Sequence, residues 1–107
     1  MRSHEWIDER SLALDRLIAE KLRHAPALLE KARATLARWI RQRNPVIPSS
    51  LIEWRDCLAQ SSFGEILNLL TGTDERARRL RQSSPFCGIL SSKERLAILK
   101  EYEARRT

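Results

Sequence analysis

The sequence predicts an all-α protein, a compact single-domain bundle of about five to six short helices over residues 1–107. Apolar residues recur at intervals of three and four along most of the chain. Three Ser-x-x-Glu patterns, typical of capping boxes at helix starts, each precede apolar residues at helical spacing. Glycine (3) and proline (4) are scarce, which argues against sandwiches, barrels and linkers.

The first predicted helix covers about residues 6–24. Its apolar stripe comprises Ile7, Leu14, Leu17, Ile18, Leu22 and Ala25. Two charged residues, Arg10 and Lys21, fall on the same stripe. Either their aliphatic stems run along the core, or the helix begins after Arg10. Proline disfavours the helical conformation in the residue before it, so Ala25-Pro26 ends this helix.

A second helix is predicted over about residues 26–42, since proline suits the first helical turn. Its buried stripe comprises Leu29, Ala32, Leu36, Trp39 and Ile40. Two prolines among residues 44–48 end it and form a connector. We expect all three tryptophans to anchor the core, with Trp6 as an alternative partner-binding residue.

Three later helices are predicted to begin at capping boxes. The pairs are Ser50 with Glu53, Ser62 with Glu65, and Ser91 with Glu94. The helix that begins near Ser62 ends at Gly72, which we expect in the left-handed conformation. A short fifth helix follows, which begins at Thr73 or Asp74 and runs to about Gln82. Ion pairs four residues apart are expected in the last two helices: Asp74 with Arg78, Glu75 with Arg79, and Glu101 with Arg105.

Motifs for catalysis or metal binding are missing from the sequence. The histidines and cysteines (His4, His24, Cys57 and Cys87) stand at none of the usual metal-site spacings. His24 is better explained as a cation at a helix end. The carboxylates mostly have local roles in caps and helical ion pairs. We therefore expect no enzyme, catalytic residue, metal or cofactor; the alternative is a small enzyme or ligand site in the loop of residues 81–93.

The protein is predicted to be cytoplasmic. Its first residues carry charges instead of an apolar signal region, and no apolar run approaches the roughly 20 residues of a membrane span. Two cysteines indicate no disulfide framework and fit reduced thiols. Lys and Arg number 20 against 14 Asp and Glu, and this charge of +6 favours polyanionic partners over cationic ones.

Two basic surfaces are candidate nucleic-acid or anion-binding sites. The second helix carries Lys31, Arg38 and Arg41 opposite its apolar stripe. The fifth helix carries four arginines, whose planar guanidinium groups suit phosphate or carboxylate: Arg76, Arg78, Arg79 and Arg81. With the helix before it, the fifth helix has a weak likeness to a helix-turn-helix motif. The alternative for both surfaces is a solvated, salt-bridged helix face.

The loop after the fifth helix is a further candidate site. It places two hydroxyls and a proline before one large aromatic ring, Phe86, which is predicted to plug the core. Ser83, Ser84 and Phe86 are also candidate partner-binding residues, because the free amides of the next helix start offer an anion or peptide site nearby.

Four segments together give the chain a resemblance to a known family: Arg-Ser-Leu-Ala-Leu (10–14), Ala-Glu-Lys-Leu (19–22), Glu53-Trp54, and Arg-Gln-Ser-Ser-Pro-Phe (81–86). Over nearly its whole length the sequence resembles a largely uncharacterised family of small helical bacterial proteins, sometimes associated with toxin–antitoxin-like gene pairs. The resemblance implies a bacterial cytosolic protein with an antitoxin-type role, and it carries over no catalytic residue.

The leading hypothesis is a non-enzymatic helical binding protein, antitoxin-like, which acts by protein–protein interaction with a partner such as a cognate toxin. The alternative is a DNA-binding transcriptional regulator that uses the arginine-rich fifth helix or the basic strip of the second. No membrane partner is expected. A homodimer stays open, because helical proteins of this size often dimerise.

Overall fold

The computed structural model describes residues 3–106 and the side chains of residues 6–105. The described residues hold six α-helices, one 3-10 turn and no strand, which confirms the predicted all-α single-domain bundle. The elements are α1 (Ser3–His24), η1 (Pro26–Leu28), α2 (Leu29–Arg43), α3 (Ser49–Gln60), α4 (Phe63–Thr71), α5 (Glu75–Arg81) and α6 (Ser92–Arg106). None of these helices is long and apolar enough to cross a membrane.

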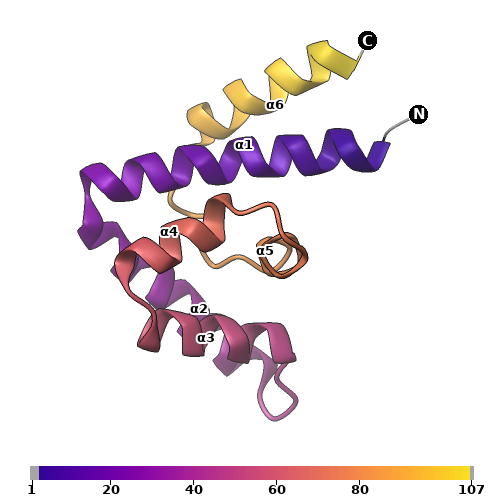
Figure 1. Cartoon of the computed structure of the whole chain (residues 1–107). Helices are drawn as coiled ribbons and strands as arrows, with labels where there is room; N and C mark the ends of the chain where they lie inside the picture. The colour runs from indigo at the N-terminus through magenta and orange to yellow at the C-terminus, as the bar shows by residue number, and fades with distance from the viewer. Residues whose placement is uncertain (1–2, 107) are drawn as a thin grey trace.

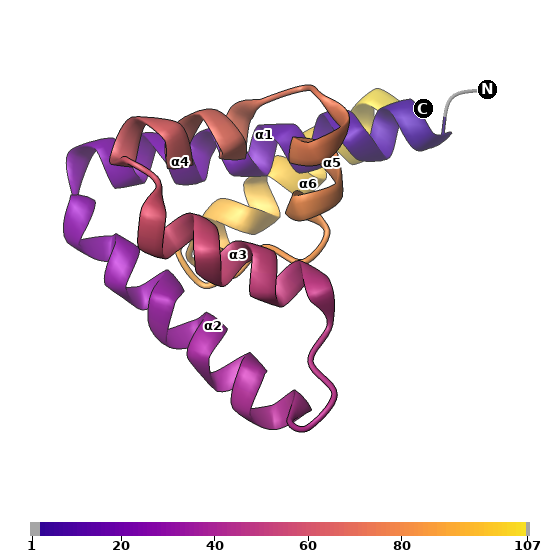
Figure 2. The same cartoon turned by 60° about the horizontal axis from the view of Figure 1, so that its bottom comes forward.

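The long helix α1 organises the bundle. It packs against α4 on one side and α6 on the other, and it also contacts α5 (Figure 1). Helices α2 and α3 pack on each other and form a hairpin that extends away from α1, with the connector of residues 44–48 at its tip (Figure 2). The bundle therefore has two parts: α1 with the three helices around it (α4, α5 and α6), and the α2–α3 hairpin.

The centre of the core is formed by Trp54 and Phe86, which have no exposed surface. Their rings pack edge to face with centroids 5.7 Å apart, the arrangement that ring quadrupoles favour. The Trp54 indole N–H donates to Leu80 O at 2.8 Å, so the polar atom of this buried ring is satisfied. Trp54 therefore anchors the core as predicted, whereas Trp6 and Trp39 are half-buried.

Helix α1 contains both charged residues of its predicted stripe, Arg10 and Lys21, and therefore does not begin after Arg10. The Arg10 guanidinium carbon lies 5.0 Å from the centroid of the Trp6 ring, and Lys21 Nζ donates to Glu94 Oε1 at 2.8 Å. Each side chain thus carries its charge to a partner at the surface, which is the first of the two alternatives. Trp6 donates to Tyr102 O at 2.7 Å, so its indole is tied to α6.

The helix starts confirm two predicted capping boxes and correct the third. Both reciprocal bonds form in two boxes: Ser62 with Glu65, and Ser91 with Glu94. The box at Ser50 is wrong, because α3 begins at Ser49 after Pro48 and no side chain caps it. Its expected partner, Glu53, is bound by two arginines of α5 instead.

Gly72 follows α4 in an extended conformation, with φ −70° and ψ 158°, so the predicted left-handed stop is wrong. The carbonyls of Leu70 and Gly72 accept hydrogen bonds from Arg81, and the helix end therefore needs no left-handed residue to satisfy them. Glycine is needed at this position for another reason. A Cβ here would lie 2.9 Å from Asn68 O, which is too close for any side chain.

Candidate functional site

The arginines of α5 are mostly held by acids from other helices. Arg76 Nε and Arg79 Nη1 each lie 2.9 Å from a different carboxylate oxygen of Glu53 on α3. Hydrogen bonds from Arg79 and Arg76 lower the pKa of Glu53 to about 2. This contact fastens α5 to the hairpin and pairs both arginines with a carboxylate of the chain itself, although each side chain stays half-exposed.

The ion pairs predicted within α5 are not formed. Asp74 caps the helix by accepting a backbone amide at 3.2 Å instead of pairing with Arg78. Arg79 turns to α3 instead of Glu75, because the α3 carboxylate can bind two guanidinium groups at once. The pair predicted on α6 is confirmed at 2.7 Å: Glu101 with Arg105.

Arg81 is a buried residue, with only 4% of its side chain exposed. Its Nη1 donates to Gly72 O at 2.5 Å and to Leu70 O at 3.4 Å. Its Nε lies 3.6 Å from Asp15 Oδ2 on α1. Within α5 only Arg78 is left exposed without an acid partner among the described residues, so three of the four arginines of the predicted surface already have partners within the fold.

Asp15 is a buried carboxylate that the sequence analysis missed. Burial raises its pKa to about 7, against the opposing effect of the positive charges of Arg81 and Arg95. It lines a cavity of about 270 Å³ between α1, α2 and the loop before α6, and Trp39 and Ser84 line the same cavity. A signal was present, because Asp15 lies three and seven residues before two core residues of the same helix face, Ile18 and Leu22.

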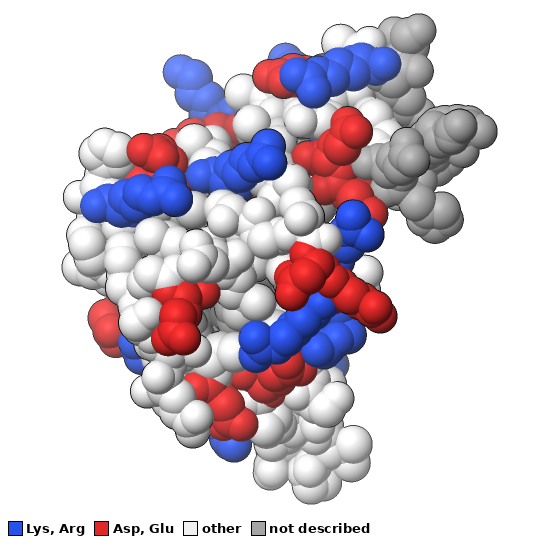
Figure 3. All heavy atoms as spheres, viewed as in Figure 1, with Lys and Arg blue, Asp and Glu red and all other residues white. Residues whose placement is uncertain are grey.

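The basic strip of α2 exists as a surface. Lys31, Arg38 and Arg41 are exposed, and none of them pairs with a carboxylate of the described residues. Arg43, at the end of the helix, is likewise exposed and unpaired. On the face drawn in Figure 3, by contrast, basic and acidic side chains alternate, so no broad region of one sign covers it.

The predicted partner-binding residues of the loop are occupied within the fold. Phe86 is a core plug, as expected, and a ring with no exposed surface offers nothing for a partner to contact. Ser84 Oγ accepts from Phe86 N at 3.2 Å, and Ser83 Oγ donates to Leu80 O at 3.4 Å. Both serines nevertheless line the cavity beside Asp15.

The helix start that follows this loop is not a vacant anion site. Glu94 Oε1 accepts from Ser91 N at 2.8 Å and from Lys21 Nζ at 2.8 Å. These bonds, that from Lys21 foremost, lower the pKa of Glu94 to about 2. The chain's own carboxylate therefore takes the place that the sequence analysis assigned to an external anion.

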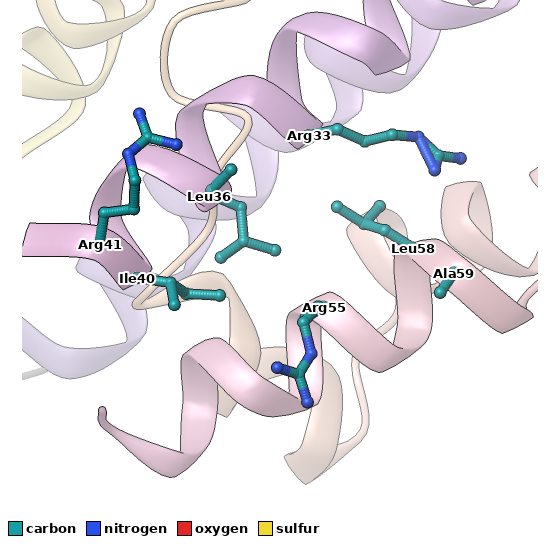
Figure 4. Close-up of a pocket in the computed structure, with 8 residues that line it drawn as sticks. Arg33, Leu36, Ile40, Arg41, Arg55, Leu58 and Ala59 are labelled. Atoms are coloured by element: carbon teal, nitrogen blue, oxygen red, sulfur yellow. The ribbon is translucent and has the colours of Figure 1, made fainter. Parts of the chain in front are cut away.

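An apolar groove between α2 and α3 was not predicted. It is a cavity of about 390 Å³ lined by Arg33, Leu36, Ala37, Ile40, Arg41, Arg55, Leu58 and Ala59. Figure 4 shows Leu36, Ile40 and Leu58 directed into the gap from both helices, with the three arginines around them. The flank of α2 that borders the groove is separate from the flank that carries Trp39.

The described residues form neither a metal site nor a disulfide. No three of their His, Cys, Asp or Glu side chains lie together in a way that holds a metal ion. Cys57 is buried and Cys87 is exposed, and both are free. The side chain of His4 lies outside the described part of the chain, and His24 is at the end of α1, where its Nδ1 lies 2.9 Å from Glu20 O.

Comparisons with known proteins found no match, so any function proposed for the chain rests on its geometry. No protein-family model, no curated protein and no solved structure matches the chain. The resemblance to a bacterial family, and the antitoxin-type role that it implies, therefore stay predictions.

Proposed function

We propose that this chain is a non-enzymatic protein-binding module, antitoxin-like and cytoplasmic, that docks an acidic amphipathic helix of a partner protein in the α2–α3 groove. The observation that carries the proposal is the groove itself. It is an apolar cavity of about 390 Å³ whose border holds three arginines. Amphipathic helices bind in grooves of this kind through apolar residues spaced three, four and seven apart.

The apolar floor supplies the anchor positions. Leu36 and Leu58 are almost fully buried and form a rigid base, while Ile40 is half-buried. Ala37 and Ala59 are exposed and small, so they leave room above that base. A partner's leucine or phenylalanine seated there would be removed from water, and such desolvated centres carry most of an interface's binding energy.

The border of the groove favours an acidic partner. Arg41 has no carboxylate partner among the described residues, and Arg55 Nε lies 3.6 Å from Asp56, too far for a hydrogen bond. Arg33 Nε is 3.2 Å from Glu30 Oε2 but donates no hydrogen bond, although it is buried. Acidic residues beside the apolar face of a partner helix would supply the missing acceptors.

Two designed helical peptides test this proposal. They share one leucine face and differ only in having Glu or Lys at its edges. Labelled peptides are titrated with the protein and followed by fluorescence anisotropy. We expect saturable binding of the Glu-edged peptide and none of the Lys-edged one. Equal binding of both would remove the charge complementarity on which the proposal depends.

A matched pair of variants on α2 localises the binding. Arg41→Glu and Arg38→Glu change the charge equally, but only Arg41 lines the groove. We expect Arg41→Glu to weaken peptide binding by about tenfold or more and Arg38→Glu to change it little at physiological salt. Equal losses in both variants, or a dimer that Arg41→Glu dissociates, would overturn the choice of an external partner for this groove.

DNA binding is the second candidate, and the unpaired strip of Lys31, Arg38 and Arg41 favours it. Binding to duplex DNA should fall steeply between low and physiological salt, because phosphate contacts release counterions. Here Arg38→Glu should weaken DNA binding while leaving the peptide bound. Failure to bind duplex DNA even at low salt would remove this candidate.

A further inference from the structure

Trp39 differs from the other two tryptophans. The indole N–H groups of Trp6 and Trp54 donate to backbone carbonyls at 2.7 and 2.8 Å. The indole N–H of Trp39 donates to no group of the described residues, although its ring is half-buried. Partly buried indoles normally satisfy this N–H, so Trp39 combines a fixed aromatic surface with an unused donor.

Trp39 lies between two cavities. The first, of about 270 Å³, is the one lined by Asp15, Ser84 and Arg95. The second, of about 350 Å³, is bordered by the α2–α3 connector and lined by Arg43. Both cavities share three lining residues, Trp39, Gln82 and Ser83, and therefore adjoin. We call the two together the Trp39 trough.

A ligand at the Asp15 end of the trough should carry neutral hydrogen-bond donors. The side chain of Asp15 is only 8% exposed, and it accepts no hydrogen bond from the described residues. Arg81 Nε, at 3.6 Å, is beyond hydrogen-bond distance, and the remaining contacts of Arg81 go to carbonyls. A cationic ligand would be repelled by Arg81 and Arg95, so N–H groups without charge fit this carboxylate best.

A ligand at the Arg43 end of the trough should carry a negatively charged group. Arg43 is exposed and pairs with no carboxylate of the described residues. Gln42, Ser50 and Gln82 line the same cavity with neutral polar groups. A ligand that spans the trough thus needs three parts: adjacent N–H donors, a planar ring and a negative group.

We propose that the Trp39 trough binds a guanine nucleotide, with the base between Asp15 and the Trp39 ring and the phosphate at Arg43. Guanine presents N1–H and N2–H₂ side by side, which matches the two oxygens of a carboxylate. Adenine pairs one donor with an acceptor on the corresponding edge and would direct that acceptor at the carboxylate. Stacking on an aromatic side chain suits any base, so Asp15 supplies the selectivity.

The three indole N–H signals in a heteronuclear NMR spectrum test the proposal. Trp39→Phe assigns the Trp39 signal by removing it. The labelled protein is titrated at about pH 8, where Asp15 is ionised, with guanosine monophosphate, adenosine monophosphate, guanosine and inorganic phosphate. We expect a saturable shift of the Trp39 signal with guanosine monophosphate, and at least about tenfold weaker binding of the adenine nucleotide.

Each remaining ligand answers one question. Guanosine should bind several-fold more weakly than its monophosphate, and inorganic phosphate alone should leave the Trp39 signal in place. A pentanucleotide with one central guanosine, compared with its adenosine counterpart, distinguishes a single-stranded nucleic acid from a free nucleotide as the source. No saturable shift with any guanine compound, or equal affinity for the two purines, would overturn the proposal.

Variants locate the two ends of the ligand. Asp15→Asn should reduce the affinity for guanosine monophosphate to that for the adenine nucleotide, provided that its circular dichroism shows a folded chain. Arg43→Gln, at an exposed position, should weaken the monophosphate several-fold and leave guanosine unchanged. Arg38→Gln, on the same helix but outside the trough, is the control and should change neither. A loss of guanosine binding in Arg43→Gln equal to that of the monophosphate would contradict the placement of the phosphate.

Discussion

Helices α2 and α5 are both rich in arginine, but the fold uses them differently. In α5, Arg76 and Arg79 bind Glu53, and Arg81 is buried beside Asp15. In α2, Arg38, Arg41 and Arg43 stay exposed and unpaired among the described residues. The difference arises because the acids that neutralise α5 come from α3 and α1, whereas no described acid of another helix pairs with the outer face of α2. Arginine density along one helix therefore does not identify a docking surface.

The two parts of the bundle reflect the same contrast. Arg81 of α5 is buried, so its guanidinium group must find acceptors within the fold, whereas Arg76 and Arg79 are half-exposed and reach Glu53 on the hairpin. The hairpin extends away from α1, and one side of α2 faces solvent. Exposure leaves its arginines solvated and ready for an external partner. Variants of α5 should therefore act on stability and variants of α2 on binding.

Removal of Arg81 should have the largest effect. Arg81→Met keeps most of the volume but leaves the Leu70 and Gly72 carbonyls without the Arg81 donor, and it takes away the positive charge that, of the two acting on Asp15, has the larger effect. We expect a loss of about 3–5 kcal/mol in the free energy of unfolding, measured by urea denaturation. Arg78→Met, on the same helix but unpaired, is the control; equal losses would mean that burial of Arg81 contributes little.

Protonation of Asp15 should give the second largest effect. Its pKa of about 7 in the folded state exceeds that of the unfolded chain, so the folded state binds the proton more tightly between about pH 4 and pH 7. The stability that Asp15 contributes is therefore present at low pH and declines as the pH rises through about 7, by at most about 1.4 kcal/mol per pH unit. Asp15→Asn should lack this decline, so the stability difference between the two proteins should change up to about pH 7 and then level off. A difference independent of pH would contradict the raised pKa.

The Glu53 contact should be weaker, because its partners are half-exposed. Glu53→Gln should cost no more than about 1 kcal/mol in urea denaturation, since solvent screens such ion pairs. The pKa of Glu53 is lowered to about 2, so its contribution is present above the unfolded value near 4.5 and is lost as the pH falls towards 2. The stability difference from wild type should shrink over that range, and a difference that grew instead would show the opposite sign of coupling.

Substitution on the outer face of α2 should have the smallest effect on stability. Arg38→Gln removes no contact among the described residues, and we expect the free energy of unfolding to change by less than about 0.5 kcal/mol. Thermal unfolding of Arg38→Gln beside Arg81→Met measures the contrast between the two helices directly. A loss above about 1 kcal/mol would show that α2 is tied to the fold by a contact of Arg38.

Local patterns in the chain were sufficient to predict the helices. The apolar stripes of α1 and α2, and the boxes at Ser62 and Ser91, depend on residues within one or two turns of each other. Both boxes are confirmed. The stripes are confirmed except at the two ends of the α1 stripe, where Ile7 and Ala25 are exposed. The box at Ser50 failed because α3 begins one residue earlier, after Pro48, and Glu53 binds two arginines more than 20 residues further along the chain. Local preference predicts a contact only where no stronger partner arrives from elsewhere.

The candidate sites, unlike the helices, could not be predicted from local patterns in the chain. The groove joins α2 to α3, and the Trp39 trough joins α1, α2, α3 and the loop before α6. Neither arrangement has a period or a spacing that can be found along the chain, because each depends on how helices cross. Composition and periodicity thus establish which segments are helical and which faces are apolar. Packing establishes which charges are neutralised, since the energy of an ion pair depends on distance and burial in space. Among the groups that it leaves without a partner in the described part of the chain are three arginines of α2 (Arg38, Arg41 and Arg43) and the indole N–H of Trp39.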